Sequence, residues 1–235
     1  MKTLPVALLC AAVVATGVLL SAAERVSFRT DDGVTIAATW YEPSNRPAPA
    51  VILVHMLHRN RRDWEPVASR LANEGVGALA IDLRGHGESS GSATGETSDY
   101  STLVMDLKAA RRYLAGRGDV QHARIGVAGA SIGANLAALH AASDAGVASL
   151  ALLSPSLDYR GLRIEQALRK YGARPVLLVA GDDDPYAKRS MRELERTGPG
   201  LRETMLLPGA GHGTVMLGRD LDLSRRLVDW FRRTL

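Results

Sequence analysis

The chain has 235 residues, of which 46% are hydrophobic and 23% charged, and its formal net charge is +4 at pH 7. This length suits one domain with a full core, and the balance of residue types is ordinary for a globular protein. Arginine and lysine residues are spread along the chain among acidic residues. The composition therefore argues against nucleic acid as a partner, which would require a clustered basic face.

Residues 1–23 differ in composition from the rest of the chain. Lys2 is followed by an uncharged and mostly apolar run at 4–20, and three small residues at 21–23 come after it. This order is typical of a secretory signal peptide that is cleaved after Ala23. The run is longer than the about 7–15 apolar residues of a signal peptide and shorter than the about 20 of a membrane span. The alternative is therefore an uncleaved anchor, the one case in which we expect a membrane contact.

Residues 24–235 are expected to form a single domain that is exported to a bacterial cell envelope, either to the periplasm or beyond it. Cys10 is the only cysteine, and it lies within the apolar run. The mature domain would therefore contain neither a disulfide nor a reactive thiol. Leu9 precedes Cys10 and the apolar run continues beyond it, which does not fit a lipoprotein signal.

Segments typical of strands and of helices alternate along this domain. Apolar or alternating runs predict strands at 25–30, 34–41, 50–55, 76–82, 125–130, 147–153, 175–180 and 201–207. Helical spacing predicts helices at 63–73, 99–115, 134–142, 162–171, 185–196 and 221–231. Such alternation indicates a mostly parallel sheet with helices on both faces, in which chemistry gathers at the carboxyl ends of the strands.

The segment Gly129-Ala130-Ser131-Ile132-Gly133 lies between a predicted strand and a predicted helix. Gly-X-Ser-X-Gly at such a junction is the arrangement that exposes a serine hydroxyl as a nucleophile. The two glycines leave space in a sharp turn, and Ser131 is expected in a strained backbone conformation. On its own, the pattern also fits a turn with an incidental serine.

A nucleophilic serine needs a base to take its proton and a carboxylate to orient that base. Gly181-Asp182-Asp183-Asp184-Pro185 follows one later predicted strand, and Gly211-His212-Gly213 follows the last one. The order serine, acid, histidine and the placement of each after a strand fit such a triad.

From Arg25 to Leu235 the chain resembles an α/β-hydrolase. Beyond the serine turn, Asp-Leu-Arg-Gly-His-Gly-Glu-Ser at 82–89 resembles the family's turn after the fourth strand, and 181–185 and 211–213 resemble its acid and base loops. The resemblance implies a three-layer α/β/α sandwich around a mostly parallel, eight-stranded sheet whose second strand is antiparallel. It also implies Ser131 as nucleophile, His212 as general base and Asp184 as orienting acid, with Asp183 as the alternative acid.

The family also has an oxyanion hole made of two backbone N–H groups, one of them from the residue after the nucleophile. That residue is Ile132, and alignment of His55-Met56-Leu57 with the His-Gly-X of relatives assigns the second N–H to Leu57. Met56 stands where relatives have glycine. The remaining histidines are expected to be structural or solvated: His55, His58, His86, His122 and His140.

The implied reaction is hydrolysis of a carboxylic ester or thioester of a small soluble substrate through an acyl-enzyme, without a metal or an organic cofactor. Only residues 154–173 separate two predicted strands where many relatives insert a lid, so the chain is similar to the lidless dienelactone-hydrolase-like group. An acyltransferase or a peptidase would use the same triad, and a binding protein on this fold would use none of it. Two residue sets carry weaker hypotheses: Arg59, Arg61 and Arg62 as an anion-attracting or merely solvated turn, and Tyr159, Arg160 and Tyr186 as cleft residues.

Overall fold

The computed structural model describes residues 23–93 and 100–235, so all but the last residue of the predicted signal peptide lies outside the described chain. The strands are β1 (Ala23–Arg29), β2 (Thr35–Tyr41), β3 (Ala48–Val54), β4 (Gly77–Ile81), β5 (Val120–Ala130), β6 (Val147–Leu153), β7 (Asp158–Tyr159), β8 (Leu162–Arg163), β9 (Val176–Gly181) and β10 (Arg202–Leu207). The α-helices are α1 (Glu65–Asn73), α2 (Val104–Ala115), α3 (Ile132–Ser143), α4 (Glu165–Tyr171), α5 (Pro185–Glu195), α6 (Met216–Arg219) and α7 (Leu223–Thr234). Short 3₁₀ helices are η1 (Arg61–Trp64), η2 (Tyr100–Leu103) and η3 (Gly213–Val215).

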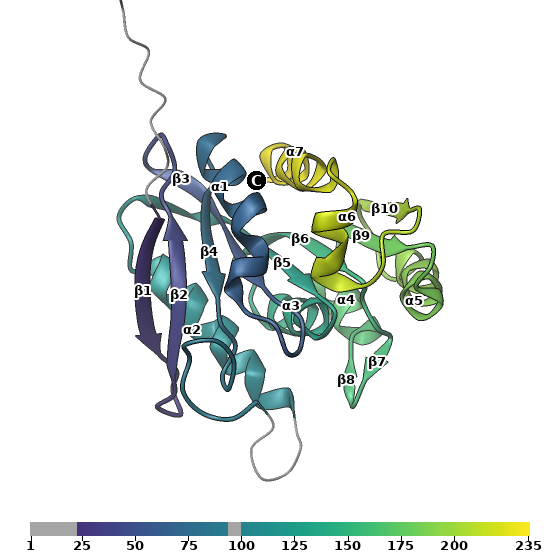
Figure 1. Ribbon diagram of the computed structural model, residues 1–235, viewed down its shortest axis with the longest axis horizontal. Coiled ribbons are helices and arrows are strands. Elements are labelled where there is room, and N and C mark those ends of the chain that lie inside the picture. Colours follow the sequence, from purple (N-terminus) through teal and green to yellow (C-terminus); the bar gives the residue numbers. More distant parts are fainter. Residues whose placement is uncertain (1–22, 94–99) are drawn as a thin grey trace, which may run out of the picture.

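Eight strands form one twisted sheet in the order β1-β2-β4-β3-β5-β6-β9-β10 (Figure 1). Strand β2 is antiparallel to both of its neighbours, and every other pairing within this sheet is parallel. The predicted eight-stranded sheet with an antiparallel second strand is confirmed. The carboxyl ends of β3, β4, β5, β6, β9 and β10 therefore lie along one edge of the sheet, where their loops can meet.

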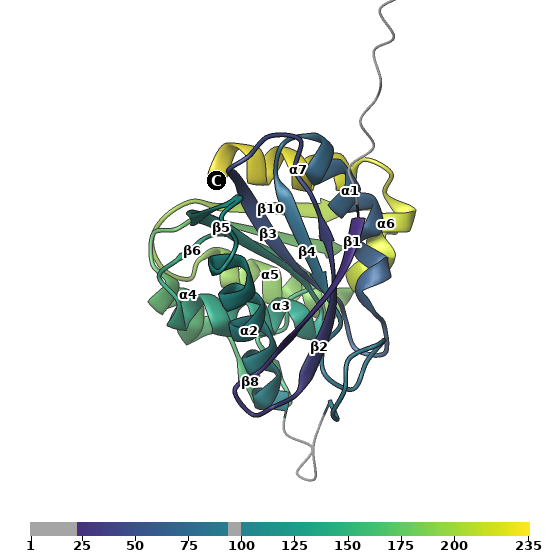
Figure 2. The same cartoon turned by 90° about the vertical axis from the view of Figure 1, so that its left-hand side faces the viewer.

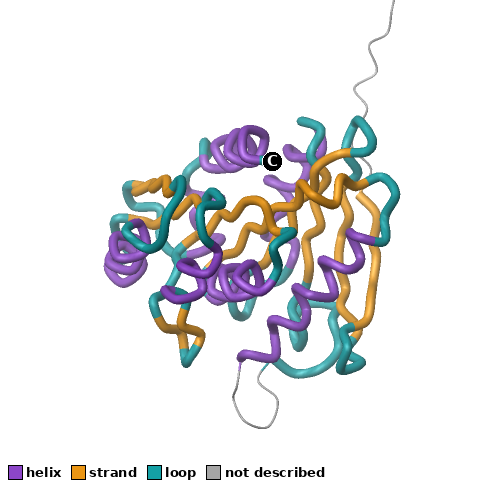
Figure 3. The backbone as a smooth tube through the Cα atoms, turned by 180° about the vertical axis from the view of Figure 1, so that it is seen from behind, coloured by secondary structure: helices purple, strands orange, loops and turns teal. Residues whose placement is uncertain are grey.

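Helices cover both faces of this sheet, as the alternating sequence predicts (Figure 2). Helices α1, α6 and α7 pack on one face, where Trp64, Leu71, Trp230 and Phe231 belong to one buried cluster. Helices α2, α3, α4 and α5 pack on the other face through a second cluster. The central strands are buried on both faces, which is why they consist of continuous apolar runs. Seen from behind, the strands form one layer between the helices (Figure 3).

The connection from β6 to β9 differs from its prediction. A helix was expected over 162–171, but Leu162–Arg163 pairs with Asp158–Tyr159 as a short hairpin, and the helix begins at Glu165. Leu162 and Ile164 are buried on either side of the exposed Arg163, which is the alternation of a strand. Within this fully described connection there is no lid domain, as expected.

The start of the first helical segment also differs from its prediction. A helix was expected over 63–73, but η1 comes first: Asn60 accepts the Arg62 N–H at its start, Asp63 lies inside that turn, and α1 begins at Glu65. Two short helices that the sequence patterns did not predict, η3 and α6, follow the predicted base loop. Across 23–93 and 100–235, no helix is long and apolar enough to cross a membrane.

Candidate active site

Ser131 lies on a sharp turn between β5 and α3, at the carboxyl edge of the sheet. Its backbone φ is +53°, a left-handed conformation that is unfavourable for a residue with a Cβ. The turn is so tight that a Cβ on Gly129 would lie 2.1 Å from the Gly133 carbonyl oxygen. The strained serine and the two space-making glycines are thus as the sequence predicts, and the turn lifts the hydroxyl away from the strand.

The structure brings Ser131, His212 and Asp184 together in one hydrogen-bonded chain. His212 Nε2 is 2.8 Å from Ser131 Oγ, and His212 Nδ1 is 2.5 Å from Asp184 Oδ2. The Asp184 side chain is 13% exposed and the His212 ring 46% exposed. The imidazole is therefore oriented from one side by a largely buried carboxylate, while its other nitrogen faces the hydroxyl at an open surface. This arrangement can move a proton from Ser131 to His212.

The three consecutive aspartates have different partners. Asp184 both contacts His212 and caps α5, because its Oδ1 accepts the Ala187 N–H. Asp183 Oδ1 accepts the Gly211 N–H and Asp182 Oδ1 accepts the Gly209 N–H, each at 2.8 Å. The exposed carboxylates of Asp182 and Asp183 thus hold the backbone of the loop that carries His212, and neither of them caps α5.

The loop around His212 has further partners that the sequence analysis missed. Ser154 directly follows β6 and is fully buried, and its Oγ accepts the Gly213 N–H at 2.9 Å. The Thr214 hydroxyl donates to Asp63 Oδ2 at 2.5 Å, and Asp63 also binds the Arg59 guanidinium. A polar residue directly after a buried strand is a signal by which Ser154 could have been found.

The two backbone N–H groups predicted for an oxyanion hole lie in adjoining segments. The start of α3 packs against the end of β3, because a Cβ on Gly133 would lie 2.6 Å from the carbonyl oxygens of Val54 and His55. Neither Leu57 N–H nor Ile132 N–H donates a backbone hydrogen bond to another described residue. The assignment of these two amides to an oxyanion hole stays a prediction.

Met56, which the resemblance to the family aligns with a glycine, contacts the base loop with its side chain. A Cβ on Gly213, whose φ is +60°, would lie 2.6 Å from Met56 Sδ. The methionine therefore fits only because residue 213 has no side chain. This contact joins the segment of Leu57 to the segment of His212.

His55 and His86 serve the backbone of the cavity loops. His55 Nδ1 donates to the Met56 carbonyl oxygen at 2.7 Å, and its Nε2 accepts the Leu83 N–H at 3.0 Å. Burial lowers the pKa of His55 to about 4, so the ring is neutral at pH 7. His86 Nε2 accepts the His58 N–H. The structural roles expected for His55 and His86 thus have specific partners.

Two buried ion pairs hold the loops that follow β3 and β4. The Arg61 guanidinium binds Asp82, whose carboxylate also accepts the N–H groups of Arg61 and Glu88. Arg84 binds Asp106, and burial raises the pKa of Asp106 to about 6. The expectation that Arg61 belongs to a solvated or anion-attracting turn is therefore wrong, because its side chain is 5% exposed and fully engaged.

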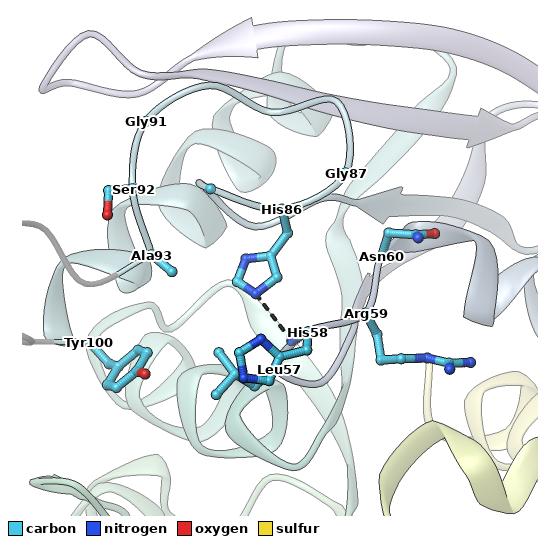
Figure 4. A pocket seen from close by; sticks show the side chains of 11 residues that line it. Leu57, His58, Arg59, Asn60, His86, Gly87, Gly91, Ser92, Ala93 and Tyr100 are labelled. Atoms are coloured by element: carbon cyan, nitrogen blue, oxygen red, sulfur yellow. Dashed lines mark hydrogen bonds between the residues drawn. The ribbon is translucent and has the colours of Figure 1, made fainter.

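A cavity of about 660 Å³ opens beside the Leu57 segment (Figure 4). It is lined by Leu57, His58, Arg59, Asn60, Gly85, His86, Gly87, Gly91, Ser92, Ala93 and Tyr100. The His86 ring points across the cavity toward His58, to whose N–H it is bonded (Figure 4). Leu57 thus belongs both to this cavity and to the predicted oxyanion hole, whereas Ser131 and His212 do not line the cavity.

The three other cleft candidates lie on the hairpin and on α5. The Arg160 guanidinium stacks over the rings of Tyr159 and Tyr100, and Tyr100 lines the cavity. The Tyr186 hydroxyl donates to the Asp158 carbonyl oxygen, and the residue as a whole is 51% exposed. Tyr159 and Arg160 therefore border the cavity through Tyr100, whereas Tyr186 braces the hairpin. No group of three or more His, Cys, Asp or Glu side chains in the described part of the chain is arranged to hold a metal ion.

Solved α/β-hydrolases share this architecture. A dienelactone hydrolase from Anabaena variabilis matches with a TM-score of 0.78 at 21% identity, covering 92% of this chain and 99% of that one. An esterase from Pyrococcus furiosus matches with a TM-score of 0.74 at 19% identity, covering 91% of each chain. At such identities the likeness shows the fold.

Sequence comparison identifies the family. The uncharacterized protein YfhR of Salmonella typhimurium is 31% identical over 245 residues, which cover 90% of this chain and 82% of the relative. The sequence model of the family described as serine aminopeptidase, S33, matches residues 45–174, more than half of the chain. The chain therefore belongs to the serine aminopeptidase S33 family of α/β-hydrolases.

Proposed function

We propose that this protein is a serine hydrolase that cleaves a carboxylic ester or thioester of a small soluble substrate. The observation that carries the proposal is the chain of hydrogen bonds from Asp184 through His212 to Ser131. The likeness of the fold to a dienelactone hydrolase and an esterase supports an ester as the bond that is cleaved.

The first half of the reaction forms an acyl-enzyme. His212 Nε2 takes the proton of Ser131 as Oγ attacks the substrate carbonyl carbon, and the N–H groups of Ile132 and Leu57 stabilise the developing oxyanion. His212 then gives this proton to the leaving alcohol or thiol as the carbon–oxygen or carbon–sulfur bond breaks. The acyl group remains on Ser131 Oγ.

In the second half, water replaces the leaving group. His212 takes a proton from water, the hydroxide attacks the acyl carbon, and the proton returns to Ser131 Oγ as the acid departs. Asp184 accepts the Nδ1–H of His212 throughout, so it keeps Nε2 free to accept a proton and stabilises the charged imidazolium. Both halves of the reaction thus rely on the contacts of His212 with Ser131 and with Asp184.

The size and openness of the site favour a small substrate. The His212 ring is 46% exposed, and the connection from β6 to β9 contains only the short hairpin and α4. The cavity beside Leu57 has a volume of about 660 Å³, which lies in the range typical of small-molecule sites. A soluble ester can therefore reach Ser131 directly from solvent.

A covalent probe and one substitution test the proposal. A fluorophosphonate should label Ser131, as mapped by mass spectrometry, and Ser131→Ala should lower kcat on short p-nitrophenyl esters by about 10⁶-fold. Ser27→Ala, on the exposed face of β1, should behave as wild type. Activity that survives Ser131→Ala would overturn the proposal. A protein that is labelled but prefers aminoacyl anilides, or transfers acyl groups to added alcohols, would instead be a peptidase or an acyltransferase.

A further inference from the structure

The backbone on both sides of His212 is held by side chains from other loops. The N–H of the preceding residue, Gly211, donates to Asp183 Oδ1 at 2.8 Å. The N–H of the following residue, Gly213, donates to Ser154 Oγ at 2.9 Å. The histidine thus lies between two anchored amides, one bound from the loop after β9 and one from the end of β6.

Ser154 is an unusual residue for a merely structural hydrogen bond. It is fully buried, and its φ is +48°, a conformation that is unfavourable for a residue with a Cβ. Its own N–H donates to the Val179 carbonyl oxygen at 2.7 Å, which fixes it between β6 and β9. The hydroxyl is therefore presented to Gly213 from a rigid part of the sheet and not from a mobile loop.

We propose that Ser154 is a positioning residue that, together with Asp183, holds His212 in register with both Ser131 and Asp184. The imidazole must satisfy two short contacts at once, 2.8 Å at Nε2 and 2.5 Å at Nδ1. A shift of the loop toward Ser131 lengthens the contact with Asp184, and a shift toward Asp184 lengthens the contact with Ser131. A misplacement of about 1 Å in such an arrangement can cost about 10²-fold in rate. The inference rests on the proposed function for its kinetic effect, but not for its effect on the geometry.

Two substitutions at Ser154 separate its hydroxyl from its backbone strain. Ser154→Gly removes the hydroxyl and accepts the positive φ, whereas Ser154→Ala removes the hydroxyl and keeps the strain. If the hydroxyl positions His212, both variants should lower kcat by about 10–100-fold with KM changed less than threefold, because misalignment of the catalytic groups slows the chemical step without weakening the binding of substrate. Wild-type kcat in Ser154→Gly would overturn the proposal.

Two substitutions at Asp183 test whether its bond to the Gly211 N–H matters. Asp183→Asn keeps an oxygen that can accept the Gly211 N–H, whereas Asp183→Ala does not. We expect Asp183→Asn to keep kcat within a few-fold of wild type and Asp183→Ala to lower it by about 10-fold or more. Equal losses in the two variants would mean that charge, for example toward Arg219 at 3.7 Å, matters instead of the bond to Gly211.

An NMR measurement tests the inference without any substrate. The proton shared by His212 Nδ1 and Asp184 should give a strongly downfield signal that disappears in His212→Gln. In Ser154→Gly this signal should broaden or vanish while the melting temperature still shows a folded protein. An unchanged signal in Ser154→Gly would overturn the inference. A wild-type protein with the signal but without fluorophosphonate labelling would refute the proposed function and leave the positioning role intact.

Discussion

The loops at the carboxyl edge of the sheet form two regions that are held in different ways. The loops after β3 and β4, which line the cavity, are held by the buried ion pairs Arg61–Asp82 and Arg84–Asp106. We call these loops the ion-paired region. The loops after β5, β6, β9 and β10 carry Ser131, Asp184 and His212. They are held mostly by short side chains bound to single backbone amides, and we call them the aligned region.

This difference matches what each region must do. A buried ion pair stabilises a loop against its neighbours only while both partners are present, because removing one leaves an uncompensated charge. A hydrogen bond from a short, rigid side chain to one amide fixes the position of one atom of the backbone. The cavity wall therefore depends on both partners of each ion pair, whereas the reacting side chains depend on individual amide contacts for their alignment.

After Ser131→Ala, the largest effect is expected when the acid of the aligned region, Asp184, is changed. Asp184→Asn should lower kcat on p-nitrophenyl esters by about 10⁴-fold, because an amide in this position favours the wrong tautomer of the histidine. The side chain can still accept the Ala187 N–H, so the melting temperature should change little. The matched control is Asp229→Asn on the exposed side of α7. A larger loss of kcat in Asp183→Asn than in Asp184→Asn would make Asp183 the acid.

The next effect concerns the ion-paired region and is measured as stability. Asp82→Ala leaves the 5% exposed Arg61 with only the half-exposed Glu88 as its ionic partner, and we expect the free energy of unfolding to fall by about 3 kcal/mol in urea denaturation. Arg233→Ala removes a pair with Glu203 whose side chains are 50% and 33% exposed. It should cost no more than about 1 kcal/mol. Similar losses in the two variants would show that the buried pair has no special weight.

The sequence predicts the aligned region better than the ion-paired one. The serine turn is local, because strand, Gly-X-Ser-X-Gly and helix follow one another along the chain. The acid and base loops are recognisable because each directly follows a predicted strand. Their meeting with Ser131 follows from the rule that loops at the carboxyl ends of parallel strands lie at one edge. The order of strands and loops along the chain is therefore sufficient to predict which side chains come together.

The partners of charged residues are harder to predict, because the contacts are distant in sequence and depend on packing. Arg61 stands in a run of basic residues that resembles a solvated turn, yet its partner Asp82 is 21 residues away, directly after the next strand. Ser154 binds an amide 59 residues further on. That contact depends on the sheet order β6-β9-β10 and on a left-handed backbone conformation at Ser154 that no sequence pattern indicated.

The smallest expected effect concerns two buried histidines, one in the ion-paired region and one in the last turn of α3. His55, in the ion-paired region, has partners for both ring nitrogens, whereas neither nitrogen of His140 in α3 has a hydrogen-bond partner among the described residues. Burial lowers the pKa of His140 to about 4 from an ordinary value of 6.5. The folded protein therefore binds fewer protons than the unfolded chain between these values, so this group removes stability as the pH falls from about 6.5 to about 4.

His140→Leu should abolish this contribution of His140. Relative to its effect at pH 7.5, the substitution should raise the free energy of unfolding at pH 4.5 by about 2–3 kcal/mol, because one unit of pKa shift corresponds to about 1.4 kcal/mol. Urea denaturation at the two pH values measures the difference. Ser143→Ala, which removes a hydroxyl bonded to the His140 carbonyl oxygen but no titrating group, should keep the wild-type pH dependence. Burial also lowers the pKa of His55, so His55 still removes stability as the pH falls. The variant should therefore keep part of the wild-type loss of stability at acid pH. An unchanged pH dependence in His140→Leu would mean that the imidazole is protonated in the folded protein without cost, with the Asp144 carboxylate, 3.7 Å from Nε2, as its partner.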